Sequence, residues 1–537
     1  QKNINEDFDV SASVGGEITN NTYRSISANS SGGLTTDGYY SLNTSVDKPN
    51  LSSFKQNTKN KAVFAKASAG YKNLIYVDGS YRMDWSSTAN PNKNVVHTRA
   101  LSSSFIFSQL IDDKSILSFG KFRVGVSEAP YFPGAYRLSS SYQVVNGAGS
   151  RPALNVPGAL NNPDLEGGER QEIEFGTELK FFRNRIGLDI SYYTKTDKNL
   201  PVGLTLDPAT GNTSVNVNSG KQTYKGLEIA ISGTPFKTEN FTWNTAINFA
   251  TLERTVDELA LGIQNNYLAA YSFRPNYWGN ESMINMQERV GQEWGAIYGR
   301  RIKRNDAGKV FINPNGTYVT EESQYLGNHL PDFTGGFTNN FTYKNFSLSL
   351  GIDFQKGGKF FSITDMFGRA SGNHISTVGN NALGNPVRDP LLDASGNAAA
   401  GAAILVNNTG AASGGKLING VDPTTGNDVS YYVDLNADGW NKFAIGDEFL
   451  YDSSYIKLRT VAVSYNFPKA FLTKLGIQDA KIGVYANNVW LIYSKVPYLD
   501  PSELESPNSA GNGGHSFIEG GQAPGSKSFG LNLNFTF

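Results

Sequence analysis

The last ten residues, Ser528 to Phe537, alternate strictly between large apolar and small or polar side chains. Successive side chains of a β-strand point to opposite faces, so this segment predicts a strand with one continuous hydrocarbon face. A soluble sheet can contain such a strand, and so can a membrane barrel, whose lipid-facing strands are about ten residues long. A closing aromatic residue favours the barrel, because aromatic side chains collect at bilayer interfaces. The apolar positions of this expected barrel-closing strand are Phe529, Leu531, Leu533, Phe535 and Phe537.

Thirteen further segments alternate in the same way, which predicts fourteen strands in all. Within 456–466 the apolar phase slips, and a β-bulge near Arg459 and Thr460 would explain the slip. The thirteen segments are 8–18, 62–71, 74–84, 101–109, 116–126, 171–182, 185–196, 224–233, 241–251, 334–343, 346–355, 456–466 and 481–492.

The connections between these segments alternate between short and long. The short ones are 72–73, 110–115, 183–184, 234–240, 344–345 and 467–480, and the long ones are 19–61, 85–100, 127–170, 197–223, 252–333, 356–455 and 493–527. Outer-membrane barrels have short periplasmic turns and long extracellular loops, whereas structureless loops of this length are uncommon in a compact soluble domain. The sequence therefore predicts an all-β fold, a transmembrane antiparallel up-and-down β-barrel with both chain ends on the periplasmic side.

Two smaller elements are expected outside the strands. Residues 293–303 alternate inside a long connection, which predicts a hairpin above the membrane. Residues 467–475 predict a helical cap on the short-turn side.

Composition removes several function classes. The 537 residues include no cysteine, which excludes a disulfide framework, a thiolate metal site and a cysteine nucleophile. Lysine plus arginine (47) nearly equals aspartate plus glutamate (48), so nothing in the charge balance favours nucleic acid as a partner. No apolar run approaches eighteen residues, which argues against transmembrane helices. No nucleophile elbow is present, and we do not expect an enzyme.

An ordered set of short motifs points to a known family. It includes Asn162-Pro163-Asp164-Leu165, Phe182-Arg183-Asn184, Lys225-Gly226-Leu227-Glu228, Pro331-Asp332-Phe333 and Ser454-Tyr455-Ile456-Lys457-Leu458-Arg459. Each motif is weak alone, but together, from about 162 to 537, the chain resembles the SusC/RagA-type TonB-dependent transporters of the Bacteroidetes outer membrane. One departure is Glu166-Gly167-Gly168-Glu169, where the family usually has Pro-Glu.

The resemblance implies more than this chain contains. Such transporters have an N-terminal plug, a segment that contacts TonB and a barrel of twenty-two strands, of which the fourteen here would be the last. No plug-like segment precedes Phe8, so we expect the C-terminal barrel portion of a longer transporter, either as a fragment or as one piece of a split barrel. A complete fourteen-stranded barrel without a plug is the alternative.

The family also implies partners and a location. The partners are a SusD-like surface lipoprotein that covers the barrel, the TonB complex acting through the missing N-terminal part, and the lipids of the outer membrane. The long loops 252–333 and 356–455 are the expected docking surface for the lipoprotein.

Aromatic residues in the long loops are candidate substrate contacts. Aromatic faces stack on sugars or on peptide side chains, although the same residues could equally pack the loops together. The candidates are Tyr271, Phe273, Tyr277 and Trp278 in one loop, and Tyr431, Tyr432 and Trp440 in another.

One acidic stretch has the spacing of a calcium loop. Asp434, Asn436 and Asp438 alternate and are followed by Gly439, which suits the oxygen ligands of Ca²⁺. The twelfth position is Ile445 instead of glutamate, so the EF-hand form fails. A surface turn rich in Asp and Asn is the alternative.

These observations lead to a functional expectation of active import. The expected cargo is a large nutrient, an oligosaccharide or an oligopeptide, taken up with energy delivered by TonB. A passive fourteen-stranded channel and a structural or docking barrel in an envelope complex are the two alternatives.

Overall fold

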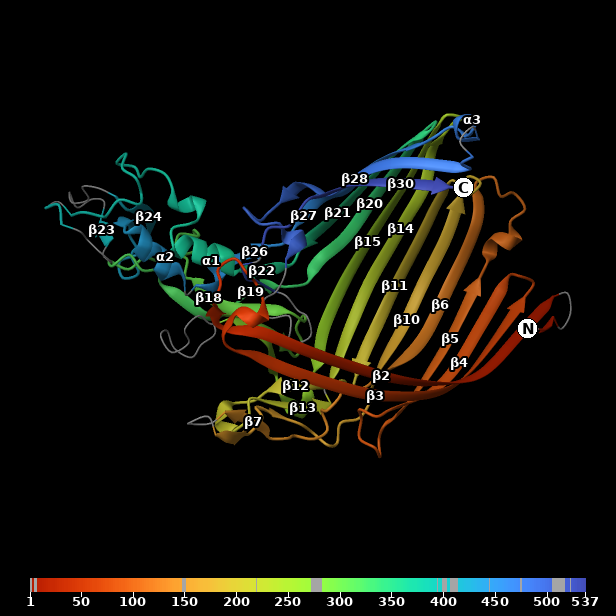
Figure 1. The fold of residues 1–537 in the computed structure, drawn as a ribbon, viewed down its shortest axis with the longest axis horizontal. Helices are drawn as coiled ribbons and strands as arrows, with labels where there is room; N and C mark the ends of the chain where they lie inside the picture. The colour runs from red at the N-terminus through yellow and green to blue at the C-terminus, as the bar shows by residue number, and fades with distance from the viewer. Residues whose placement is uncertain are drawn as a thin grey trace.

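The computed structural model describes most of the chain. The described residues are 2–3, 7–146, 151–218, 220–271, 283–393, 395–397, 403–405, 414–443, 445–473, 476–504, 517–521 and 523–537. One large antiparallel sheet dominates the molecule and curves into a wall (Figure 1). Its strands follow the order of the chain, each pairing with the next along the sequence.

The wall consists of fourteen long strands and the two-residue β1 (Lys2–Asn3), which confirms the predicted number. The long strands are β2 (Phe8–Leu34), β3 (Ser45–Tyr71), β4 (Ile75–Ser86), β5 (Val95–Phe105), β6 (Leu117–Tyr131), β10 (Gly168–Phe181), β11 (Ile186–Lys198), β14 (Lys221–Lys237), β15 (Phe241–Glu258), β20 (Pro331–Tyr343), β21 (Phe346–Gly357), β27 (Tyr455–Asn466), β28 (Asp479–Ser494) and β30 (Ser528–Thr536). Among the described residues β1 and β30 do not pair with each other, so the wall is open.

The connections predicted to be short and those predicted to be long lie at opposite ends of the wall, but their observed lengths do not alternate strictly, because 87–94 is shorter than 106–116. The short ones lie at one end of the wall, together with the start of β2, the end of β30 and the helix α3 (Lys469–Leu472), which confirms the expected cap (Figure 1). The long ones lie at the opposite end and carry the remaining helices and small sheets.

The predicted long loop 19–61 is wrong. Strands β2 and β3 continue to pair from Phe8 and Tyr71 as far as Leu34 and Ser45, so the connection is only 35–44. Apolar alternation ends near Ile18 because a strand that projects beyond the bilayer needs no hydrocarbon face, while its backbone hydrogen bonds continue. The polar sequence therefore concealed a projecting hairpin.

Strand register joins the apolar positions into one surface. In three neighbouring strands Val463 lies opposite Val484, and Val484 lies opposite Leu531. In the closing strand Phe529, Leu531, Leu533, Phe535 and Phe537 are all more than half exposed. Cross-strand partners share a face, so this surface is the lipid-facing side of the wall.

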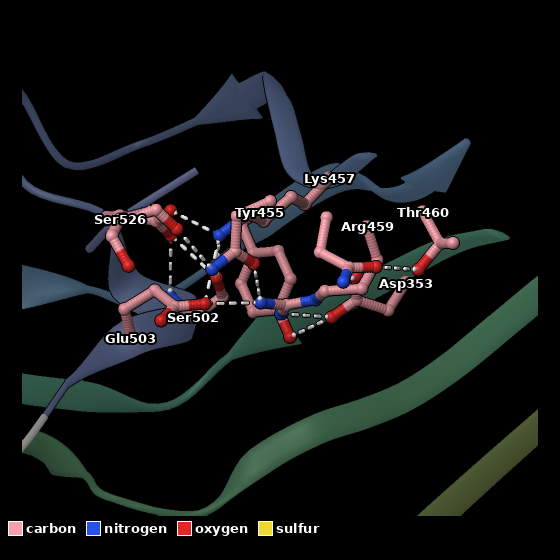
Figure 2. Close-up of polar contacts among 11 residues, drawn as sticks. Asp353, Tyr455, Lys457, Arg459, Thr460, Ser502, Glu503 and Ser526 are labelled. Carbon is pink, nitrogen blue, oxygen red and sulfur yellow. Dashed lines mark hydrogen bonds and ion pairs between the residues drawn. The ribbon is translucent and has the colours of Figure 1, made fainter. Parts of the chain in front are cut away.

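The bulge expected near Arg459 and Thr460 is confirmed. Gly351 of β21 pairs with Thr460 and Ile352 pairs with Leu458, which leaves Arg459 as the extra residue. Such a bulge re-aims side chains, and it places Arg459 and Thr460 on the same side of β27, the polar side (Figure 2).

Small sheets and helices fold from the long connections. The sheets are β7 (Gln143–Asn146) with β8 (Pro152–Asn155); β9 (Ala159–Leu160), β12 (Pro201–Thr205) and β13 (Ser214–Asn218); β16 (Asn265–Tyr271), β17 (Ile284–Arg289), β18 (Ala296–Ile302) and β19 (Thr320–Asn328); β22 (Lys359–Ser362), β26 (Leu450–Asp452) and β29 (Ile518–Glu519); and β23 (Ala403–Leu405), β24 (Lys416–Val421) and β25 (Asp428–Val433). The helices are α1 (Ile363–Ala370) and α2 (Leu435–Phe443). The alternating piece 293–303 contributes β18 to a four-stranded sheet instead of forming a separate hairpin.

The main hydrophobic core among the described residues lies mostly in these connections, with Val256 added from the loop end of β15. It joins residues of three connections, for example Trp294 (2% exposed), Phe361 (0%) and Phe517 (0%). We call this unit, formed by the described parts of 259–330, 358–454 and 517–521, the outer-loop domain (left in Figure 1). Apolar burial of this extent fixes the three connections relative to one another. None of the helices in the described parts of the chain is long and apolar enough to cross a membrane.

The stability of the outer-loop domain is expected to fall in mild acid. His329, between β19 and β20, is half-buried, and burial lowers its pKa below the ordinary 6.5 despite a hydrogen bond between Nδ1 and the carbonyl oxygen of Lys359 (3.1 Å). The unfolded state then binds the proton at a higher pH than the folded state, so stability is lost as pH falls below 6.5. The urea midpoint of the domain should drop between pH 7.5 and pH 5.5 more in wild type than in His329→Gln, and an equal drop would contradict this assignment.

Candidate functional site

Charged residues line the face of the wall opposite the lipid. In β10 this follows from the period of two, because the acidic residues alternate with the apolar ones. Arg123 donates from Nη1 and Nη2 to the Asp189 carboxylate (2.9 and 2.7 Å) and from Nε to Glu174 (3.3 Å). The neighbouring Lys121 pairs with Glu178 at 2.7 Å.

The ion pairs continue towards the loop end of the same strands. Arg170 donates from Nε and Nη2 to the two carboxylate oxygens of Asp197, at 2.6 and 2.7 Å. This bidentate geometry is the strongest form of such a pair. The polar face is therefore a wall of mutually neutralised charges, which suits a water-filled or plugged lumen.

A cavity of about 680 Å³ lies at the loop end of the wall, where the connections 132–167, 199–220 and 259–330 meet. Its volume falls within the usual range for ligand sites, roughly 300–1,000 Å³. Strands β12 and β13 form one side of it, and residues of β16 and β17 form another.

We call this cavity the mouth cavity, and buried polar groups form its floor. Arg254 donates to Gln222 Oε1 from Nε and Nη2 (2.8 and 2.6 Å), and Gln222 Nε2 donates to Glu288 Oε1 (2.8 Å). Asn266 Nδ2 donates to the other Glu288 oxygen (3.1 Å), and Trp294 Nε1 donates to Glu288 Oε1 (3.1 Å). Because the buried carboxylate receives several donors, the floor is rigid.

Aromatic and amide groups surround the opening of the mouth cavity. Tyr131 and Tyr267 are about half exposed (50% and 47%). Arg137 Nη1 donates to Asn216 Oδ1 (2.6 Å), which lies on β13 and also lines the cavity. Aromatic faces together with amides can recognise the repeating polar and apolar groups of a peptide or a glycan.

A second polar cluster fastens the connection between β28 and β30 to the wall (Figure 2). Lys457 of β27 is 3% exposed, and its Nζ donates to Asp500 Oδ2 (2.6 Å), Ser502 Oγ (3.1 Å) and Glu503 Oε1 (3.1 Å). We call Lys457, Arg459, Asp353, Asp500 and Glu503 the loop anchor.

The bulge completes the loop anchor. It turns Arg459 towards Asp353, which accepts hydrogen bonds from Nε (3.1 Å) and Nη2 (2.6 Å), and towards Glu503, which Nη1 contacts. In the connection, burial tends to raise the pKa of Asp500, but hydrogen bonds from Lys457 and Ser502 outweigh it and leave the pKa below its ordinary value. The carboxylate is thus held charged.

Of the predicted aromatic contacts, the structure describes the side chains of Tyr431, Tyr432 and Trp440. Tyr271 ends β16, and Phe273, Tyr277 and Trp278 lie outside the described residues. Tyr431 and Tyr432 are buried in the outer-loop domain (6% and 4% exposed), where Tyr431 packs with Ile312 and Ile418, so in this conformation neither ring is available to a solute. Trp440 is 42% exposed and stays a candidate.

The acidic stretch forms the start of helix α2 instead of an open loop. Asp434 accepts a hydrogen bond from the backbone N–H of Ala437 (3.0 Å), as a helix cap does. Asp438 accepts from Tyr318 Oη (3.0 Å) and Lys416 Nζ (3.2 Å), while Asn436 lies in the first turn. In the described part of the chain no group of three or more acidic or histidine side chains is arranged to hold a metal ion. Calcium binding at Asp434, Asn436 and Asp438 stays a prediction.

Sequence reasoning missed the floor of the mouth cavity. Gln222, Arg254 and Glu288 come from three strands and share no motif or spacing. The one available signal is that Gln222 and Arg254 lie just beyond the loop ends of the predicted strands 224–233 and 241–251, where a polar residue can face the mouth.

Comparison with known proteins places these features in a family. The family described as "TonB dependent receptor-like, beta-barrel" matches residues 1–353. TonB-dependent receptor P3 of Formosa agariphila is 24% identical over 515 residues, which is 90% of this chain and 46% of that protein. TonB-dependent receptor SusC of Bacteroides thetaiotaomicron is 25% identical over 190 residues, 33% of this chain and 18% of that protein.

Solved structures show the same fold. A structure of the RagAB peptide importer in the "closed-closed" state covers 100% of this chain with a TM-score of 0.72, at 17% identity, and 54% of the other chain is matched. The chain therefore spans about half the length of the relatives that it matches. The family model matches residues 1–353, and the fourteen-stranded wall with its polar inner face agrees with that match. The chain therefore belongs to the TonB-dependent receptor-like β-barrel family of the outer membrane.

Proposed function

We propose that this chain forms part of a transporter that imports a large nutrient across the outer membrane with energy supplied through TonB. The cargo would be an oligopeptide or an oligosaccharide. The observation that carries the proposal is the mouth cavity, a volume of about 680 Å³ floored by fixed amide and charged groups at the loop end of a polar barrel wall.

The remaining parts of such a machine would lie outside this sequence. The open edges of the wall leave backbone groups unpaired, which a bilayer does not tolerate. We therefore propose that the wall is closed by further strands and filled by a plug that TonB acts on. A SusD-like lipoprotein would cover the mouth and rest on the outer-loop domain, whose core makes it a firm platform.

Uptake by whole cells tests this proposal. Cells carrying the full-length protein should accumulate labelled oligopeptide or oligosaccharide, and a protonophore or deletion of TonB should abolish the accumulation. Uptake that persists without TonB would favour the passive channel. No uptake of either class, together with stably bound protein partners, would favour the docking barrel.

A cavity variant makes the test specific to this site. Tyr267→Ala removes a half-exposed ring from the mouth cavity and should raise the solute concentration for half-maximal uptake roughly fivefold. Tyr325→Ala is the matched control, because Tyr325 is 53% exposed on β19 and is not among the residues that line the cavity. Equal effects of the two variants would remove the cavity from the transport route.

A further inference from the structure

A groove of about 590 Å³ crosses the outer surface of β2, β3 and β4, on the side facing away from the lumen. Gly16, Ile18 and Val63 supply an apolar floor, Lys59 and Lys61 border it, and Trp85 closes one side. A Cβ added at Gly16 would find its nearest neighbours at 3.6 and 4.0 Å, so the absence of a side chain here keeps the groove deep. The groove is independent of the mouth cavity and of the proposed import.

Strand register places the lysines on the lipid-facing side. Lys61 lies opposite Ile18 in β2 and opposite Trp85 in β4, and Lys59 lies opposite Asn20. Cross-strand partners share a face, so Lys59 and Lys61 continue the exposed apolar row of Val14, Ile18 and Val63.

This face carries cations without matching acids. Arg24 and Lys55 form a cross-strand pair further along the same face, beyond the groove. The outward positions of residues 14–28 and 51–63 include no aspartate or glutamate. Glu17, at the edge of the groove, points to the opposite face, where Arg82 Nη2 contacts it at 3.1 Å. Across the described part of the chain, neither Lys59 nor Lys61 forms an ion pair with a carboxylate.

The height of the groove fits a lipid headgroup. It lies where the apolar band ends and beside the connection 87–94, on the side of the long, extracellular loops. Tryptophan and lysine are the residues that anchor a protein at this level of a bilayer. The lysines would otherwise be costly beside hydrocarbon, and a phosphate group would neutralise them with strong charge-assisted hydrogen bonds.

We propose that this groove binds a phosphorylated glycolipid of the outer leaflet, with its phosphate on Lys59 and Lys61 and an acyl chain over Gly16, Ile18 and Val63. Charge complementarity selects the phosphate, and the apolar floor continuous with the lipid-facing band selects a lipid over a soluble anion. Such a lipid would hold β2 and β3 at the membrane surface where their hairpin leaves the bilayer.

Titration of the full-length, delipidated protein with fluorescent diphosphoryl lipid A in mixed micelles tests the site. Lys59→Gln with Lys61→Gln should weaken binding about thirtyfold, since each cation near an anionic surface contributes a few-fold to affinity. Lys66→Gln is the matched control, because Lys66 is an exposed lysine of the same strand on the opposite face. Binding unchanged in the double variant, or weakened equally in the control, would overturn the proposal.

Two further sets of measurements distinguish binding of the lipid from binding of a free anion, and a loss of binding from a folding defect. Gly16→Leu should fill the groove and weaken lipid binding while both lysines remain, whereas Lys59→Arg with Lys61→Arg should bind like wild type. Dephosphorylated lipid should bind weakly, and inorganic phosphate should not compete at millimolar concentration. Displacement by inorganic phosphate, or full binding of the dephosphorylated lipid, would overturn the assignment.

Discussion

Replacing Lys457 with methionine is expected to free the segment 495–504 from the barrel wall. The lysine is 3% exposed and donates to Asp500, Ser502 and Glu503, all in the connection between β28 and β30 (Figure 2). Removing Lys457 leaves the partly enclosed Asp500 carboxylate with its hydrogen bonds from Ser502, while Glu503 keeps its ion pair with Arg459. Breaking a buried pair in this way costs about 3–5 kcal/mol.

Hydrogen exchange of the detergent-extracted protein measures this release. The backbone N–H groups of Ser502 and Glu503, which are bonded to Asp500, should lose most of their protection in Lys457→Met. Lys495→Met is the control, because Lys495 pairs with Asp452 at 2.6 Å in an exposed position (49% and 33%). Solvent screens an exposed pair, so the control should exchange like wild type. Unchanged protection in Lys457→Met would show that apolar packing, and not the loop anchor, holds the segment.

Trp294→Ala should destabilise the outer-loop domain by about 3–5 kcal/mol, the usual cost of removing a large buried aromatic ring. Trp294 is 2% exposed within the core that joins three connections. Its Nε1 donates to Glu288, and the Arg254 guanidinium lies 4.0 Å from the ring centroid. The substitution therefore also loosens the floor of the mouth cavity, and we expect domain stability and solute affinity to fall together.

Urea unfolding of the outer-loop domain, followed by hydrogen exchange in β17, would measure this loss. Trp440→Ala is the matched control, since Trp440 is 42% exposed and packs mainly on Phe443, with ring centroids 5.0 Å apart. It should cost no more than about 1 kcal/mol. If both variants lowered the urea midpoint equally, the core around Trp294 would not be what holds the three connections together.

The positions of these features suggest how the parts would work together in the proposed transporter. The loop anchor holds one long connection against the polar side of the wall, and the outer-loop domain binds the ends of three connections into one body. A solute entering the mouth would contact connections that are held in place by the loop anchor and by the core of the outer-loop domain. Specificity would then depend on which side chains these surfaces present, as at the floor formed by Gln222, Arg254 and Glu288.

The sequence alone determined the wall. A strand in a bilayer must place apolar side chains on every second position. Residues such as Leu531 and Leu533 therefore predict both the strand and its lipid-facing side. Short turns between such strands leave little choice of partner, which is why fourteen strands and their order could be predicted. The slip of phase at Arg459 was visible for the same reason.

The tertiary structure decided most of what lies beyond the bilayer on the side of the long connections. There, both faces of a strand meet water, so the sequence needs no apolar side chain at every second position. The continuation of β2 to Leu34 therefore left no apolar signal. Tyr431 is a core residue because it packs with Ile312, and Asp438 forms an ion pair with Lys416. No motif links the members of either pair. The mouth cavity joins Gln222 to Glu288, 66 positions later, and the loop anchor joins Lys457 to Asp500, 43 positions later. Such contacts follow from how long connections pack in space, and local pattern carries no record of that packing.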